Sequence, residues 1–307
     1  MILCCGEALI DMLPRETPAG ERAFAPYSGG AVFNTAIALA RLGAETQFFS
    51  GLSDDLFGQQ LVETLERDGV DTALAARSSR PTTLAFVTLT DGHASYAFYD
   101  ENTAGRMLSP GDLPDAVSAK ALFFGGISLV VEPCAEAYAA LCAREAGERV
   151  VMIDPNIRPG FISDEDTYRA RLGAMLPRAD VVKLSDEDLH WLKGEGDIAT
   201  LAGELVSEGT KIVCITEGAK GVTAFTARGS VGVTAQRVEV VDTVGAGDTF
   251  NAGFLAALDR AGVLTKDAIA ALDDETLRAA LALGTRAAAV TVSRAGANPP
   301  TAAELGL

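Results

Sequence analysis

The residues best suited to chemistry lie in one short stretch, residues 240–258, which reads VVDTVGAGDTFNAGFLAAL. Its glycine-rich turn, Gly245-Ala246-Gly247, is followed directly by Asp248 and then by a predicted helix over residues 249–258. A turn that runs into a helix start leaves backbone N–H groups unpaired, and the helix dipole adds to their attraction for an anion. The stretch therefore predicts a phosphate-binding turn with a carboxylate at its rim.

The position of Asp248 beside a phosphate-binding turn is explained if the carboxylate takes part in the reaction. Asp248 would repel a phosphate, but it could remove the proton from a hydroxyl group that attacks the phosphorus. The N–H groups of Gly245, Ala246 and Gly247 would then stabilise the charge that develops. The alternative is that Asp248 only stabilises the helix start, as acids commonly do there. The stretch lacks the Lys-Ser/Thr pair of a Walker A loop, and Phe250 replaces the third glycine of the dinucleotide fingerprint.

The elements that must position this stretch alternate along the chain. Short apolar runs predict strands at residues 2–10, 46–50, 121–124, 150–153, 181–182 and 212–215, and a late hairpin at 222–225 and 230–234. Helical periodicity predicts helices at residues 31–42, 56–67, 133–146 and 275–292. Such alternation predicts an α/β fold with a mostly parallel sheet and helices on both faces.

One region interrupts the alternation. Residues 82–90 and 94–99 are rich in Thr, Val, Phe and Tyr and flank Asp91-Gly92, which is a β-hairpin signal. We expect residues 12–27 and 82–99 to form a small β lid over a cleft. Residues 1–11, 28–81 and 100–307 are then expected to form the α/β domain that binds the ligands.

Composition limits the classes of partner. The chain has 307 residues and a net charge of −17, which argues against nucleic acid or anionic membranes as partners. No apolar run is long enough to span a bilayer, and the first residues lack the basic segment of a signal peptide. Five cysteines without a CxxC pair lie in apolar stretches, which indicates reduced, buried thiols and a cytoplasmic location.

Polar residues follow the apolar runs at the points where strands should end. In open α/β sheets ligands bind beyond the carboxyl ends of the strands, so these residues predict a site at one edge. They are Asp11, the segment DPNIR at 154–158, Lys183, Ser185 and Asp188, the segment TEG at 216–218, and the Gly245 turn after the apolar pair at 240–241.

Several of these segments resemble the ribokinase (PfkB) family of sugar kinases. DTVGAGDTF resembles the family's C-terminal signature, SGGAVFN its N-terminal signature, and DPNIRP the corresponding segment of fructokinase-like members. The likeness covers essentially the whole chain. It implies a ribokinase-like fold and transfer of the γ-phosphate of ATP to a sugar hydroxyl, with Mg²⁺ on the nucleotide phosphates.

The resemblance also implies roles for single residues. The sugar would be bound by Asp11, Gly29, Gly30, Asn34 and Arg158. The nucleotide would be bound by Lys183, Ser185, Thr216, Gly218, Gly221, Gly245, Gly247, Gly296, Ala297 and Asn298. KLSDED departs from the family's NxxE segment, because Ser185 replaces Asn and Asp188 replaces Glu. Asp188 could still place Mg²⁺ through water, with Glu187 as a neighbouring candidate, and Asp242 marks where a monovalent cation such as K⁺ would be sought.

The acceptor sugar is left open between two main candidates. The segments resemble fructokinases most, which implies fructose as substrate and fructose 6-phosphate as product. A 2-keto-3-deoxygluconate kinase is the nearest alternative, because Arg106 could pair with the carboxylate of an acid substrate. A nucleoside kinase, a nucleotide-dependent oxidoreductase and a non-catalytic sugar-binding protein of the same fold are more distant readings. The exposed edges of a β lid also allow a homodimer.

Overall fold

The main sheet of the protein is a mixed sheet that is parallel over most of its width. The computed structural model describes residues 1–90 and 93–307, so the Asp91-Gly92 turn lies outside the described residues. Within the described part, the sheet has eight strands in the order β14-β13-β12-β11-β10-β9-β1-β4. The strands are β1 Ile2–Cys5, β4 Thr46–Phe49, β9 Ala121–Gly125, β10 Val150–Asp154, β11 Val181–Ser185, β12 Ile212–Thr216, β13 Val222–Thr226 and β14 Gly229–Val233. Among the described strands of this main sheet, the pairs β12-β13 and β13-β14 are antiparallel and the other pairs are parallel. This arrangement confirms the α/β fold and the late hairpin.

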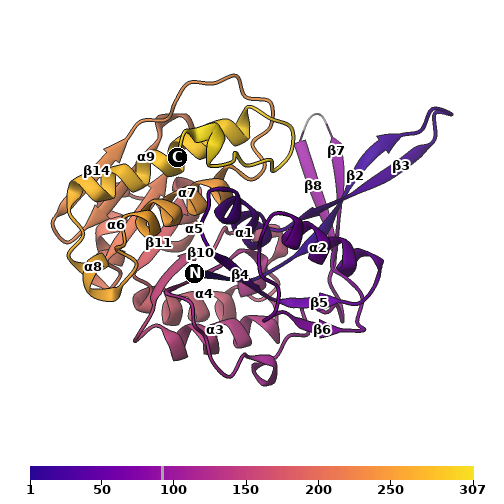
Figure 1. Cartoon of the computed structure of the whole chain (residues 1–307), viewed down its shortest axis with the longest axis horizontal. Coiled ribbons are helices and arrows are strands. Elements are labelled where there is room, and N and C mark those ends of the chain that lie inside the picture. Colours follow the sequence, from indigo (N-terminus) through magenta and orange to yellow (C-terminus); the bar gives the residue numbers. More distant parts are fainter. Residues whose placement is uncertain (91–92) are drawn as a thin grey trace.

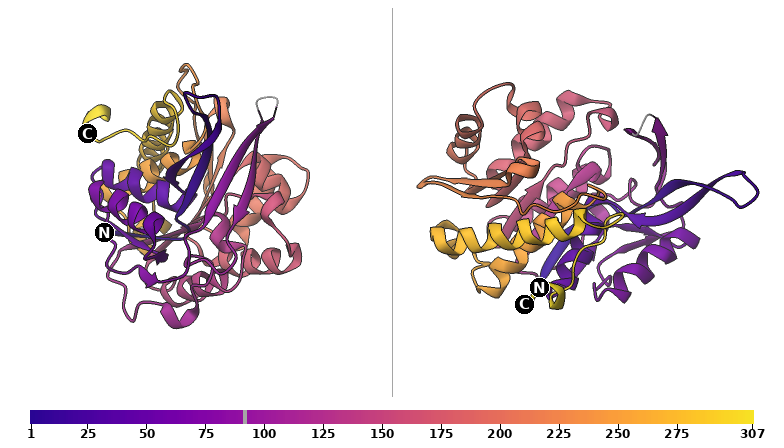
Figure 2. Two further views of the ribbon diagram at one scale, coloured as in Figure 1. Left: turned by 90° about the vertical axis from the view of Figure 1, so that its right-hand side faces the viewer. Right: turned by 90° about the horizontal axis from the view of Figure 1, so that it is seen from above.

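Helices cover both faces of this sheet, as Figure 2 shows in two views. They are α1 Ala31–Arg41, α2 Leu56–Arg67, α3 Cys134–Glu145, α4 Glu165–Met175, α5 Asp186–Lys193, α6 Ile198–Ser207, α7 Ala246–Arg260, α8 Lys266–Ala270 and α9 Asp274–Val292. Alternate residues of each strand enter different cores: Met152 of β10 packs with α1, α7 and α9, whereas Ile153 packs with α3 to α6. This two-residue alternation explains why the strands are apolar without interruption.

A second, four-stranded sheet stands beside the main one, in the order β3-β2-β7-β8. Its strands are β2 Leu9–Glu16, β3 Arg22–Gly29, β7 Leu84–Thr90 and β8 His93–Tyr99. The β2-β3 hairpin projects from the body of the molecule (Figure 1). A separate two-stranded sheet consists of β5 Gly51–Ser53 and β6 Ala76–Ser78, and the sequence pattern did not predict it.

The apolar run at residues 2–10 is two strands rather than the single strand predicted. The chain leaves the main sheet after Cys5 and enters the small sheet at Leu9. Gly6 permits this turn, because a methyl group on it would lie 2.4 Å from a methyl carbon of Val32. The break places Glu7 between the two sheets, where it is buried.

The apolar pair at residues 240–241 is not a strand. Val240 and Val241 are 60% and 59% exposed, and the N–H of Val241 donates to the carbonyl of Val292 at the end of α9. The backbone of this two-residue run bonds to the end of a helix and not to a neighbouring strand.

In the described ranges, no helix is both long and apolar enough to cross a bilayer. The cysteines of the chain are buried free thiols.

Candidate active site

The start of α7 has the backbone geometry that favours an anion. Gly245 precedes the helix with a left-handed backbone (φ 78°), a conformation that favours glycine. The helix begins at Ala246, three residues earlier than predicted, so Asp248 lies within the first turn. Among the described residues, the N–H groups of Gly245, Gly247 and Asp248 have no hydrogen-bond partner, whereas Ala246 donates to the carbonyl of Thr243 at 3.3 Å. Unpaired N–H groups at a helix start, together with the helix dipole, favour an anion at this position.

Asp248 is buried at this helix end and bonded to the predicted sugar-binding segment. It is 7% exposed, and its Oδ2 accepts a hydrogen bond of 2.9 Å from the amide nitrogen of Asn34. Burial raises the pKa of Asp248 to about 7, although the bond from Asn34 opposes that rise. A carboxylate with a pKa near 7 is suited to accept a proton at neutral pH. The structure thus joins two residues 214 positions apart in the chain.

Lys183 is buried next to the first turn of α7. The sequence placed it on the nucleotide phosphates, but its side chain is 6% exposed and its ammonium pairs with Asp154 at 3.0 Å. The same oxygen of Asp154 accepts a bond of 2.7 Å from Asn251 of α7. Asn251 was missed by the sequence reasoning, because an Asn inside an apolar helix carries no motif of its own.

Glu7 organises the glycine pair of the SGGAVFN segment. Its two oxygens accept the N–H groups of Ala31 at 2.9 Å and of Ser128 at 3.3 Å. A methyl group on Gly30, which has a φ of 112°, would lie 2.9 Å from the carbonyl oxygen of Glu7. Burial raises the pKa of Glu7. The sequence reasoning also missed this residue, although a lone acid inside an apolar run was a visible signal.

Asp11 of β2 lies on the same face of the small sheet as its cross-strand partners Tyr27 and Ala85. A methyl group on Gly29 would lie 2.3 Å from its Oδ2, so the glycine leaves room for the carboxylate. Burial raises the pKa of Asp11 to about 6. Burial also raises the pKa of Tyr96, and the charges of Asp11 and Arg158 act on it in opposite directions. Asp11 and Arg158, two of the predicted sugar-binding residues, are thus both near enough to Tyr96 for their charges to act on it. Arg158 itself is exposed, and its guanidinium donates to the carbonyl of Ile157 at 3.0 Å.

Arg106 is not a free cation. Its Nη1 donates to both carboxylate oxygens of Asp100 at 3.1 Å, and its Nε donates to the carbonyl of Glu132 at 3.3 Å. The pair lines a small cavity that also contains Glu7. Because Asp100 neutralises Arg106 and Glu7 adds a second acid, this cavity does not offer the net positive charge expected for an acid substrate.

The segment at residues 294–298 packs against the anion-binding turn. Asp242 accepts N–H groups from both sides, from Val244 at 3.0 Å and from Gly296 at 2.9 Å. A methyl group on Gly245 would lie 2.7 Å from the Cβ of Ala297. Asn298 points elsewhere, since its side-chain oxygen accepts a bond of 3.0 Å from Arg41 on α1. It is therefore a link between this segment and α1 rather than a group turned toward a nucleotide.

The remaining predicted nucleotide residues follow β11 and β12. Thr216 ends β12, and its hydroxyl donates to the carbonyl of Leu184 at 3.4 Å. Gly218 and Gly221 have φ values of 53° and 113° and bound a short turn before β13. Both strand ends open at the same edge as Asp154 and the start of α7.

Ser185 and Asp188 form a capping box at the start of α5. Asp188 accepts the N–H of Ser185 at 3.3 Å and, through its other oxygen, the N–H of Ile157 at 3.1 Å. Both oxygens therefore hold backbone, which fixes the DPNIR loop to α5. A carboxylate has further lone pairs for a bridging water. In residues 1–90 and 93–307, no three His, Cys, Asp or Glu side chains form a cluster that could hold a metal ion.

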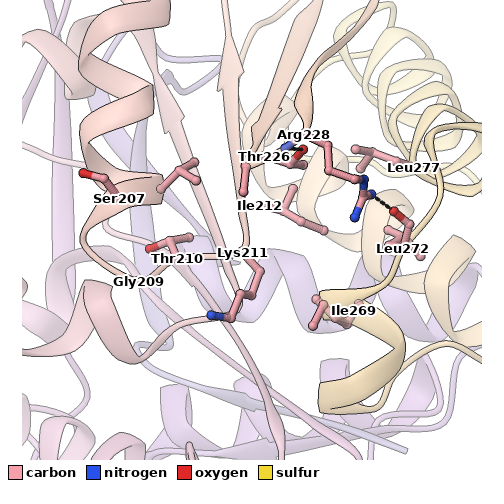
Figure 3. Close-up of a pocket in the computed structure, with 13 residues that line it drawn as sticks. Ser207, Gly209, Thr210, Lys211, Ile212, Thr226, Arg228, Ile269, Leu272 and Leu277 are labelled. Atoms are coloured by element: carbon pink, nitrogen blue, oxygen red, sulfur yellow. Dashed lines mark hydrogen bonds between the residues drawn. The ribbon is translucent and has the colours of Figure 1, made fainter.

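A larger cavity, of about 290 Å³, lies at the opposite edge of the sheet, where β12 begins. Figure 3 shows that its two cations, Lys211 and Arg228, point in different directions, and that Arg228 donates to the carbonyl of Leu272. They do not converge on a common point as the groups around Asp248 do, so we place the active site at the start of α7.

Comparison with known proteins fits this geometry. The model of the pfkB family carbohydrate kinases matches residues 1–304. A fructokinase of Rhizobium leguminosarum bv. trifolii is 55% identical over 279 residues, which cover 91% of this chain and 86% of that protein.

Solved structures of fructokinases have a fold similar to that of this chain. A fructokinase of Xylella fastidiosa with bound ATP is 33% identical with a TM-score of 0.89, over 96% of this chain and 93% of that one. A fructokinase of Vibrio cholerae with fructose, ADP and a calcium ion is 27% identical with a TM-score of 0.85, over 96% and 94%. A double mutant of that enzyme with fructose, ADP and a potassium ion is 26% identical with a TM-score of 0.85, over 96% and 93%.

Proposed function

Because the chain belongs to the pfkB family of carbohydrate kinases, we propose that it transfers the γ-phosphate of ATP to D-fructose with Asp248 as the catalytic base. It is an ATP-dependent sugar kinase of the fructokinase type, and its product is expected to be fructose 6-phosphate. The observation that carries the mechanism is the bond of 2.9 Å between Asn34 and Asp248, which joins the sugar-binding segment to the phosphate-binding helix end.

The geometry supports the following course. Asn34, Gly29, Gly30 and Asp11 hold the hydroxyl groups of the sugar, since amide and carboxylate groups supply both donors and acceptors. Asp248 accepts the proton of the attacking hydroxyl as the oxygen approaches phosphorus. The N–H groups of Gly245, Gly247 and Asp248 then donate to the phosphoryl oxygens as their negative charge is redistributed in the transition state.

The ion pair between Arg106 and Asp100 favours fructose over an acid substrate. This pairing leaves no free cation in that cavity for the carboxylate of 2-keto-3-deoxygluconate. The 55% identity to a fructokinase supports the same choice. A non-catalytic sugar-binding protein would have no need for a buried carboxylate at the phosphate-binding turn.

Mg²⁺ is the proposed metal, and it would neutralise charge on the nucleotide phosphates when bound. Mg²⁺ is usually held by one or two carboxylates together with phosphates, so the absence of a protein cluster in the described residues fits this mode. Asp188 would contribute only through a water, since both of its oxygens already accept backbone N–H groups. A potassium ion would be sought at Asp242 and the turn that follows it. Asp242 accepts N–H groups from Val244 and Gly296 and so connects this turn to the segment at residues 294–298.

The small sheet is proposed to act as a lid that excludes water from the sugar. The face of this sheet opposite Asp11 carries Phe24, Phe86 and Tyr99 in edge-to-face contact, and Phe24 and Tyr99 are 43% and 63% exposed. An exposed aromatic face of this kind supports the homodimer proposed from the sequence. Free buried thiols support the proposed cytoplasmic location.

The test is ADP formation with Mg-ATP and one acceptor at a time: D-fructose, 2-keto-3-deoxygluconate, ribose, adenosine or none. We expect saturable ADP release with fructose at a kcat/KM far above the others. Preference for the keto acid would overturn the choice of sugar, and ADP release equal to the acceptor-free rate in every case would overturn the kinase assignment.

A further inference from the structure

A buried ion pair lies directly behind the anion-binding turn. Lys183 at the end of β11 and Asp154 at the end of β10 are 4% and 2% exposed, and their charged atoms are 3.0 Å apart. Buried ion pairs add little stability on average, because removing two charges from water costs about as much as their attraction returns. A costly arrangement at this place calls for a use other than stability.

The pair is tied to α7 by two contacts. Asn251, which is 1% exposed and lies one turn after Asp248, donates to the same Asp154 oxygen at 2.7 Å. A methyl group built on Gly247 would lie 3.1 Å from the ammonium nitrogen of Lys183. The ammonium therefore lies against the first turn of α7, whose unpaired N–H groups are the proposed phosphate donors.

We propose that Lys183 is a positioning residue that supplies a fixed positive charge behind the Gly247 turn, held in place by Asp154 and Asn251, and that it raises turnover without binding the nucleotide. This rests on the proposed role of Asp248 as base. The charge stabilises the negative charge that builds at the helix end in the transition state, and the low polarity of the site strengthens that effect.

The charges around the ammonium favour its remaining protonated. Burial alone lowers the pKa of Lys183, but the nearby carboxylates of Asp154, Asp188 and Asp248 outweigh burial and raise it. In return, Lys183 opposes the rise in the pKa of Asp248, which burial, Asp154 and Glu7 drive upward. Removal of the ammonium should therefore raise the pKa of Asp248 further, because its positive charge then no longer stabilises the ionised form.

The variant Lys183→Met separates this role from direct nucleotide binding. We expect kcat to fall roughly 10- to 100-fold, less than the loss of a direct oxyanion donor, while the KM for ATP and the Kd for ADP change less than about threefold. The acid limb of the kcat/KM profile should move to higher pH by about one unit. Lys120→Met, which removes a half-exposed lysine paired with Asp259, is the control and should leave every parameter unchanged.

A second variant covers a failure to fold. Lys183→Met leaves Asp154 buried without a partner, so the double variant Lys183→Met/Asp154→Asn removes that charge and keeps an acceptor for Asn251. Low kcat with unchanged ADP affinity in the folded double variant supports the proposal. A Kd for ADP raised tenfold or more with kcat retained overturns it, and so does a kcat equal to that of the parent. Failure of the proposed function would instead appear in the parent chain, as no ADP formed with any acceptor.

Discussion

The hydrogen bond from Asn34 to Asp248 should set the pH range in which the enzyme works. Burial raises the pKa of Asp248 to about 7, and the 2.9 Å bond from Asn34 stabilises the ionised carboxylate. Hydrogen bonds to charged groups contribute about 1.5–3 kcal/mol, and one pKa unit corresponds to about 1.4 kcal/mol. Asn34→Ala should therefore raise the pKa of Asp248 by about 1–2 units, to about 8–9.

The activity follows from the sign of that shift. A base acts only when deprotonated, so the rate falls as the pH drops below the pKa of Asp248. At pH 7 the ionised fraction should fall from about one half to roughly 1–10%, and it should recover near pH 9. The assay is kcat/KM for fructose at saturating Mg-ATP from pH 5.5 to 9.5, in which the position of the acid limb, and not the height of the curve, is compared.

The neighbouring residue provides the control for this experiment. Thr35 donates to the backbone carbonyl of Asp248 at 3.3 Å and does not contact the carboxylate, so Thr35→Val should leave the acid limb in place. Loss of a sugar contact in Asn34→Ala lowers the whole curve equally at every pH. An acid limb at the same pH in Asn34→Ala and the parent would refute the assignment of Asp248 as the titrating base.

Three further predictions concern specificity and stability. Asp100→Asn releases Arg106, so kcat/KM for 2-keto-3-deoxygluconate relative to fructose should rise about 10- to 100-fold, and an unchanged ratio would contradict the role given to that pair. Gly253→Ala places a methyl group 2.7 Å from the backbone of α9 and should destabilise the protein by about 1–3 kcal/mol in urea unfolding, whereas Gly203→Ala in α6 meets nothing within 4 Å and should be neutral or stabilising. Folding raises the pKa of Asp248 to about 7, so ionisation of this carboxylate destabilises the folded parent protein at high pH. Asp248→Asn should therefore be more stable than the parent by several kcal/mol at pH 8, and the difference should vanish toward pH 4. Equal stability of the two proteins at both pH values would contradict the raised pKa.

The fold could be predicted because its strands and helices have strong local patterns. The boundaries of α2 were predicted as they are, and the late hairpin was recognised from two short apolar runs. The split of residues 2–10 was not predicted, because periodicity does not show when a continuous apolar run changes sheets. Gly6 and Glu7 mark that change, and the role of both depends on contacts with α1 and Ser128 that are remote in sequence.

The candidate site was proposed from the sequence where a residue type has a specific chemistry. The proposed phosphate-binding turn rests on Gly245 and the start of α7, and the structure adds the contact between Asn34 and Asp248. The roles of charged side chains were harder to predict, because a sequence does not show which partner neutralises each charge. Arg106 pairs with Asp100 and Lys183 with Asp154, so neither is the free cation that the sequence suggested. Pairing of this kind is decided by tertiary structure.

Asp248 is proposed as the base that deprotonates the sugar. The most direct measurement is single-turnover ADP formation by Asp248→Asn with saturating fructose and Mg-ATP, together with calorimetric Kd values for fructose and ADP. We predict a rate lower by about 10²–10⁴-fold with both Kd values within a few-fold of the parent. A single-turnover rate within tenfold of the parent, in a variant that binds both ligands normally, would contradict the claim.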